Sequence, residues 1–239
     1  MNKIKLMHDV IKTMKDKEVI KGTFKAEGRK DQNAIFGCNN EFEKNTVTGQ
    51  IKAKINVEFD CDGNKVKHES TIDINTKKCH EHAHHNHDFM KHMHEHHHGR
   101  EFGGGFKEKL NKLAFALNIL NSIKVDEQQD KSVLLSLSLN EIPEEIKQAF
   151  KQRHEAMCQQ REGMFQQREG MFQQREGMHQ HHAFMKELHS IAEPNIELNV
   201  RISKNSEIES IVLSINGKQN GENSEAHDVN GRAELNLAW

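Results

Sequence analysis

The sequence predicts an α+β fold in which a single curved antiparallel sheet of about seven strands wraps helices, with a long helix that protrudes or folds back. Several stretches alternate apolar and polar residues with a period of two, which is typical of strands with one buried and one solvated face. Other stretches repeat apolar residues with a helical period. We interpret residues 1–239 as one domain with two polar insertions, at 76–105 and 151–190.

The first third of the chain contains one predicted helix and four predicted strands. Residues 3–16 form an amphipathic pattern whose core-facing stripe is expected to be Ile4, Met7, Ile11 and Met14, with Leu6 and Val10 widening it. The strands are predicted at 20–27, 34–43, 50–59 and 65–75. Asp62-Gly63-Asn64 predicts a hairpin turn between the last two strands.

The rest of the chain mixes helix and strand patterns. A leucine stripe predicts a helix over 106–123, and SVLLSLSL predicts a strand over 132–139. Asn140 and Pro143 then favour the start of a helix that continues to about residue 190. A helix of that length would reach roughly 70 Å, too long for the interior of a compact domain. Three alternating stretches after Pro194 predict the closing strands.

The predicted long helix contains an internal heptad repeat. QQREGMF occurs at 159–165 and again at 166–172, and QQREGMH follows at 173–179. A heptad period places the methionines on one slowly drifting helix face, which favours packing against a partner helix. The repeat therefore suggests a docking surface that could support a homo-oligomer.

A histidine tract lies between the two halves of the chain, from Cys79 to His98. Neutral imidazole is a good ligand for nickel, zinc and copper, so this tract predicts a divalent transition-metal site. The candidate ligands are His80, His82, His84, His85, His87, His92, His94, His96, His97 and His98. Cys79 at the start of the tract, and a second group beyond the heptads, are further candidates. That second group is His179, His181, His182 and His189.

Catalytic motifs are weak in this chain. HExxH occurs at His80–His84 and at His94–His98, where a metalloprotease would need two zinc ligands and a general base. Histidine is so frequent in the tract that composition alone produces both matches. We therefore expect no enzyme activity and no organic cofactor.

Charge and hydropathy narrow the range of partners. Lysine and arginine number 34 against 36 acidic residues, so a net charge of −2 gives no electrostatic case for nucleic acid or for an anionic membrane. No apolar run is long enough for a transmembrane helix, and the first residues lack the apolar core of a secretory signal. The sequence as given is therefore expected to be cytoplasmic, and extracytoplasmic if the chain has been trimmed.

Four stretches of the chain resemble the bacterial lipoprotein-carrier (LolA-like) half-barrels. They are the opening helix followed by VIKGTFKAEG, the hairpin IKAKINVEFDCDGNKVKHESTIDI, the motif SVLLSLSLNEIPEEIKQAF, and the ending that starts at PNIELNVRISKNSEIES. The resemblance implies a concave apolar face that holds lipid or another hydrophobic ligand.

The sequence thus leaves three functions open. The first is metal binding or metal buffering by the histidine tract. The second is carriage or sensing of a hydrophobic ligand on the half-barrel. The third is a structural or partner-binding role through the methionine-rich helix.

Overall fold

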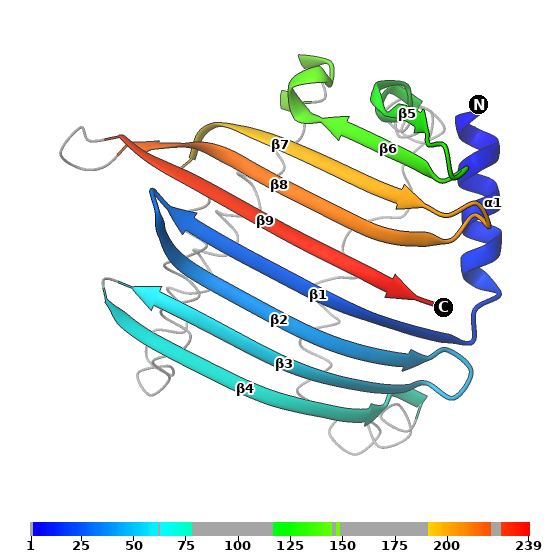
Figure 1. Ribbon diagram of the computed structural model, residues 1–239, viewed down its shortest axis with the longest axis horizontal. Helices are drawn as coiled ribbons and strands as arrows, with labels where there is room; N and C mark the ends of the chain where they lie inside the picture. Colours follow the sequence, from blue (N-terminus) through cyan, green and yellow to red (C-terminus); the bar gives the residue numbers. More distant parts are fainter. Residues whose placement is uncertain (1, 62, 78–116, 145–146, 149–190, 221–225) are drawn as a thin grey trace, which may run out of the picture.

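The fold is described from a computed structural model, which defines residues 2–61, 63–77, 117–144, 147–148, 191–220 and 226–239. Its centre is one nine-stranded sheet with the order β4-β3-β2-β1-β9-β8-β7-β6-β5, in which every neighbouring pair is antiparallel (Figure 1). The strands are β1 (Val19–Lys30), β2 (Asn33–Asn45), β3 (Gln50–Cys61), β4 (Asn64–Asn75), β5 (Lys124–Glu127), β6 (Val133–Ser138), β7 (Ile191–Ile202), β8 (Ile208–Asn220) and β9 (Ala226–Ala238).

The predicted α+β class is wrong. The described residues form one continuous antiparallel sheet with only short helices, the α-helix α1 (Lys3–Lys15) and the 3-10 helix η2 (Leu139–Glu141) among them. The prediction interpreted the heptad repeat as a long packed helix. In the described residues, pairing between strands sets the architecture. Residues 149–190, which hold most of the predicted long helix, lie outside the described residues.

The strand count and the helix over 106–123 also need correction. Within the described part of that range, helix covers 117–122, and the chain then enters β5. This strand is four residues long and only Val125 in it is apolar, so it carries no readable alternation. The sheet therefore has nine strands where about seven were expected.

The β3–β4 hairpin is confirmed. Cys61 pairs with Asn64, and Gly63 in the turn has a φ of 85°, a backbone conformation that favours glycine. The β1–β2 turn is tied to a distant strand, because Asp31 N–H donates to the carbonyl of Asp228 at 2.7 Å. Short turns thus build β1–β4 in sequence order, and β9 then pairs with β1 to join the two ends of the chain.

The pleat and the register separate two chemistries onto two faces of the sheet. Side chains directly opposite in an antiparallel pair lie on the same face. We call one side the apolar face, because the ladder places Phe24, Ala26, Phe36, Cys38, Phe42, Ala53, Ile55, Val57, Phe59, Ile72, Ile211, Leu213, Ala233, Leu235 and Leu237 there. The other side, the polar face, carries mostly charged residues and amides.

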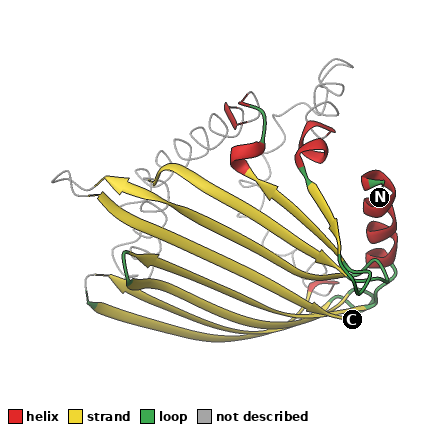
Figure 2. Ribbon diagram, turned by 45° about the horizontal axis from the view of Figure 1, so that its top comes forward, coloured by secondary structure: helices red, strands yellow, loops and turns green. Residues whose placement is uncertain are grey.

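Helix α1 packs on the apolar face, but only at one corner. Leu6 and Val10 form a buried cluster with Val133 and Ile202, and Met14 packs against it. The sheet is bowed, and α1 stands at the end where β7 and β8 turn (Figure 2). The predicted core stripe of α1 is therefore wrong for Ile4, Met7 and Ile11, which are exposed. Two apolar stripes lie side by side on this helix, and its contact with β6 and β7 buries the other one.

Two further contacts fix the α1 corner. The side chain of Asn2 caps the helix by accepting hydrogen bonds from the backbone N–H groups of Ile4 and Lys5. The indole N–H of Trp239, at the end of the chain, donates to the carbonyl of Ile208 at 3.0 Å.

In the described residues no helix is long and apolar enough to cross a membrane.

Candidate functional site

The apolar face over β1–β4 and β9 is the candidate site. In the described part of the chain, the buried hydrophobic residues are Leu6, Val10, Val133, Ile142, Ile202 and Val229. None of them belongs to β1, β2, β3 or β4. The phenylalanines and aliphatic side chains that these strands place on the apolar face are therefore only half-buried or exposed. A surface of this kind is a binding surface or an aggregation hazard.

Two small residues, Gly22 and Ala53, lie at the centre of this face. One row across the strands runs through Leu237, Gly22, Phe42, Ala53 and Ile72. Glycine at position 22 is required by close packing, since a Cβ atom there would lie 2.8 Å from Cζ of Phe42 and 2.6 Å from the carbonyl oxygen of Asn236. The Phe42 ring thus lies across the Gly22 backbone. Ala53, the next residue in the row, has only a methyl side chain.

An aromatic pair lies at the end of the apolar face nearest the β3–β4 turn. The rings of Phe36 and Phe59 are cross-strand neighbours with centroids 5.2 Å apart and an interplanar angle of 45°. The next row holds Cys38 opposite Val57. Burial raises the pKa of the Cys38 thiol, so this cysteine stays protonated and acts as a small apolar residue.

A buried polar atom lies in the middle of the apolar face. Asn40 lies between Phe24 and Ile55, at a position where the alternation calls for an apolar residue. Its amide oxygen is buried and accepts no hydrogen bond within the described residues. A buried acceptor without a donor costs about 1–3 kcal/mol. The sequence signal for this group is the doublet Asn39-Asn40 inside an alternating strand.

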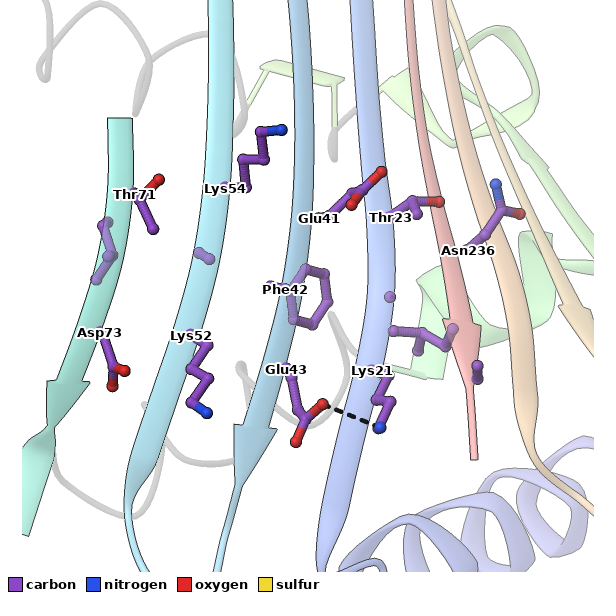
Figure 3. Close-up of a pocket in the computed structure, with 15 residues that line it drawn as sticks. Lys21, Thr23, Glu41, Phe42, Glu43, Lys52, Lys54, Thr71, Asp73 and Asn236 are labelled. Carbon is purple, nitrogen blue, oxygen red and sulfur yellow. Dashed lines mark ion pairs between the residues drawn. The ribbon is translucent and has the colours of Figure 1, made fainter. Parts of the chain in front are cut away.

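The polar face contains a trough of about 580 Å³ (Figure 3). Its walls are two rows of side chains, and the strand residues between these rows form its floor. In one row Lys21, Glu43, Lys52 and Asp73 follow one another across β1 to β4, with Lys21 Nζ 2.9 Å from Glu43 Oε2. Because the charges alternate, they neutralise one another, and the trough offers no net charge to an ionic ligand.

The predicted metal ligands cannot be placed against this geometry. Cys79, the histidine tract and the second histidine group all lie outside the described residues. Those residues contain no group of three or more histidine, cysteine, aspartate or glutamate side chains arranged to hold a metal ion. His68, which the ladder places on the apolar face opposite Val57, is exposed at the sheet edge.

Within the described residues, fold and site define a single-sheet antiparallel protein whose apolar face is only partly buried. The LolA-like resemblance is not supported by comparison with known proteins, since no protein-family model and no curated protein matches the chain.

Proposed function

We propose that this protein binds an elongated apolar ligand, a long acyl chain, along the apolar face of its curved sheet. The single observation that carries the proposal is the incomplete burial of the apolar side chains on β1–β4, which α1 leaves uncovered. Burial of apolar surface is worth about 25 cal/mol per Å², so a ligand lying on this face would gain free energy along its whole length.

The shape of the face fits an extended chain with one charged end. From Phe36 to Lys44 the apolar-face positions of β2 follow one strand for eight residues, roughly 27 Å. The Phe36–Phe59 pair lies at one end of this path, and Lys44 brings an amine to the other. A fatty acid would match both ends, with its methyl group near the aromatic pair and its carboxylate near Lys44.

Two other observations support the same ligand class. The buried acceptor of Asn40 lies midway along the path and would be satisfied by a hydroxyl group on the acyl chain. The resemblance to LolA-like half-barrels, which remains a prediction, implies a lipid or another hydrophobic ligand on the equivalent face. Both are consistent with an acyl chain on a sheet whose other side is polar.

The test compares neighbouring residues that point to opposite faces of the edge strand. Fluorescence of cis-parinaric acid, and its displacement by palmitate, would be measured for the wild type, Ile72→Lys and Thr71→Lys. Ile72 lies on the apolar face and Thr71 on the polar face of the same strand. We expect Ile72→Lys to weaken binding at least about tenfold, because it puts a charge on the apolar face in the same row as Phe42 and Ala53, and Thr71→Lys to leave binding unchanged.

Two outcomes would contradict this proposal. One is the absence of saturable cis-parinaric acid binding by the folded wild type. The other is equal weakening by both lysine substitutions, which would place the probe elsewhere. Melting temperatures of the two variants, compared with the wild type, separate lost binding from lost fold.

A second candidate function is metal binding by the histidine tract. The specific observation is the density of imidazole, with ten histidines in the twenty residues from Cys79 to His98. Calorimetric titration with Ni²⁺, Zn²⁺ and Cu²⁺ would compare the full chain with a chain lacking 79–98. Sub-micromolar binding that disappears with the tract would support metal handling, and unchanged stoichiometry would refute it.

A further inference from the structure

The outer side of α1 carries apolar residues that the fold does not use. Ile4, Met7 and Ile11 are 62%, 41% and 52% exposed, although Leu6 and Val10 on the same helix are buried. Successive residues turn by about 100° around a helix axis, so the three exposed residues fall within an arc of roughly 60°. They form a continuous stripe, which we call the outer stripe of α1.

Basic residues flank the outer stripe on its solvent side. By the same helical geometry Lys15 lies about 20° beyond Ile4. Lys12 and Lys5 lie further round the helix, about 80° and 100° beyond Ile4, with His8 between Lys15 and Lys12. Asp9 projects from the side of the helix opposite the stripe, about 60° beyond Lys12, and Asp16 is the C-cap residue after the helix. The stripe and its border therefore combine apolar and positively charged groups, while negative charge is kept away from it.

A neighbouring segment enlarges this surface. The amine of Lys3 donates to the carbonyls of Leu120 and Asn121, at 3.2 and 3.1 Å, which ties α1 to the end of the helical segment 117–122. Leu117, one turn earlier in that segment, is 43% exposed. The Lys3 contact thus keeps Leu117, a further exposed apolar residue, close to α1.

We propose that the outer stripe of α1, with Lys12 and Lys15, docks onto an anionic membrane surface. An amphipathic helix with apolar residues bordered by lysines binds in the plane of a lipid interface, where its apolar side chains enter the acyl boundary and the amines meet anionic headgroups. Charge complementarity favours an anionic surface over a neutral one. This inference goes beyond ligand binding and does not depend on it, because the outer stripe is separate from the apolar face of the sheet.

The test is flotation of the full-length protein with vesicles of phosphatidylcholine, alone or with phosphatidylglycerol. It is done at pH 8, where histidine is neutral and the 18 histidines of the chain add no positive charge. We expect binding to the anionic vesicles only, weakened by salt. Ile4→Gln with Ile11→Gln should reduce binding about tenfold or more, and Lys12→Gln with Lys15→Gln about fivefold.

Matched controls use residues remote from α1. Val47 in the β2–β3 turn is 55% exposed, so Val47→Gln removes a comparable apolar side chain. Lys54→Gln with Lys218→Gln removes the same charge from β3 and β8.

Three outcomes of the flotation assay would overturn the proposal. They are equal binding to neutral and anionic vesicles, no binding to either, and equal effects of the control and α1 variants. A dimer in sedimentation velocity that the α1 variants abolish while vesicle binding stays absent would also overturn it. Loss of palmitate binding with intact flotation would instead affect only the proposed ligand function.

Discussion

The ring of Phe42 lies across the backbone of Gly22, its cross-strand partner on the apolar face. A Cβ atom added to Gly22 would be 2.8 Å from Cζ of that ring, which is closer than side-chain carbons approach one another. The same Cβ would be 2.6 Å from the carbonyl oxygen of Asn236 on β9. Gly22 therefore lets β1 fit between two neighbours at the centre of the candidate site.

We expect Gly22→Ala to destabilise the protein by about 1–3 kcal/mol, the usual cost of overpacking. For a chain of this size this corresponds to a melting temperature lowered by several degrees. Differential scanning calorimetry measures the shift. Adding Phe42→Leu should restore only part of the loss, because the Asn236 carbonyl belongs to the backbone and cannot move aside.

Gly37→Ala is the matched control for this prediction. Gly37 lies in β2, and no atom lies within 4 Å of its would-be Cβ, so alanine there should leave the melting temperature equal or slightly higher. Equal destabilisation by Gly22→Ala and Gly37→Ala would show that strand propensity, and not the Phe42 contact, sets the effect.

Asn40→Leu should raise the stability of the ligand-free protein. The substitution removes a buried amide oxygen that has no donor in the described residues and adds a larger apolar side chain with the same branching between Phe24 and Ile55. The expected gain is about 1 kcal/mol, measured as an increase in the urea midpoint. Asn39→Leu, on the polar face of the same strand, should give no such gain. A lower midpoint for Asn40→Leu would mean that the amide has a partner.

Asp31 should make the stability of the protein depend on pH in the acidic range. A hydrogen bond with His227, and then one from the backbone N–H of Asp228, hold the pKa of Asp31 below its usual value. Because the folded pKa is depressed, this stabilisation is complete above the unfolded pKa of about 3.9 and disappears as pH falls through the folded pKa.

Asp31→Asn tests whether the ionised Asp31 carboxylate stabilises the folded protein. The amide oxygen of an asparagine at this turn would still accept from Asp228 N–H, and asparagine tolerates the positive φ of 54° found here. The melting temperature of the wild type should exceed that of the variant at pH 6, and the difference should shrink as pH falls below about 3.9. A difference that stays constant from pH 6 to pH 2.5 would show that the carboxylate adds nothing.

Trp239→Phe should destabilise the α1 corner. The indole N–H bonds the Ile208 carbonyl, and Lys17 Nζ lies 5.5 Å from the ring centroid while also pairing with Glu207. Loss of the hydrogen bond should cost about 1 kcal/mol in urea unfolding followed by circular dichroism. A double-mutant cycle with Lys17→Gln measures the coupling between the two side chains. Zero coupling would show that the indole ring gives no cation–π gain over a phenyl ring at this position.

Local patterns predicted most strands but not the fold class. The alternation of Ile51, Ala53, Ile55 and Val57 reports a half-buried strand whatever its neighbours are, and β3 is found there. The Gly63 turn was likewise readable, because a two-residue hairpin demands a positive φ. The short β5 was missed, since four residues with one apolar side chain contain no period.

The candidate site was only partly predictable. The sequence showed that the strands have one apolar face and predicted that helices pack on it, but among the described residues α1 covers only one corner of that face. The helix α1 illustrates the reason. Its two apolar stripes are equally plausible in isolation, and only contact with Val133 and Ile202 decides that Leu6 and Val10 are the buried pair. The predicted metal ligands lie outside the described residues and remain predictions.

By itself, the sequence determined the strands long enough to show alternation, the Gly63 hairpin turn and the separation of apolar from polar side chains, because these depend on neighbours one or two residues away. The tertiary structure decided which strands meet. β1 pairs with β9, so Lys21 lies opposite Ala238 from the other end of the chain. Such a pairing depends on hydrogen bonds between backbones far apart in sequence, and no local period records them. That pairing places Leu237 beside Gly22 and completes the apolar face.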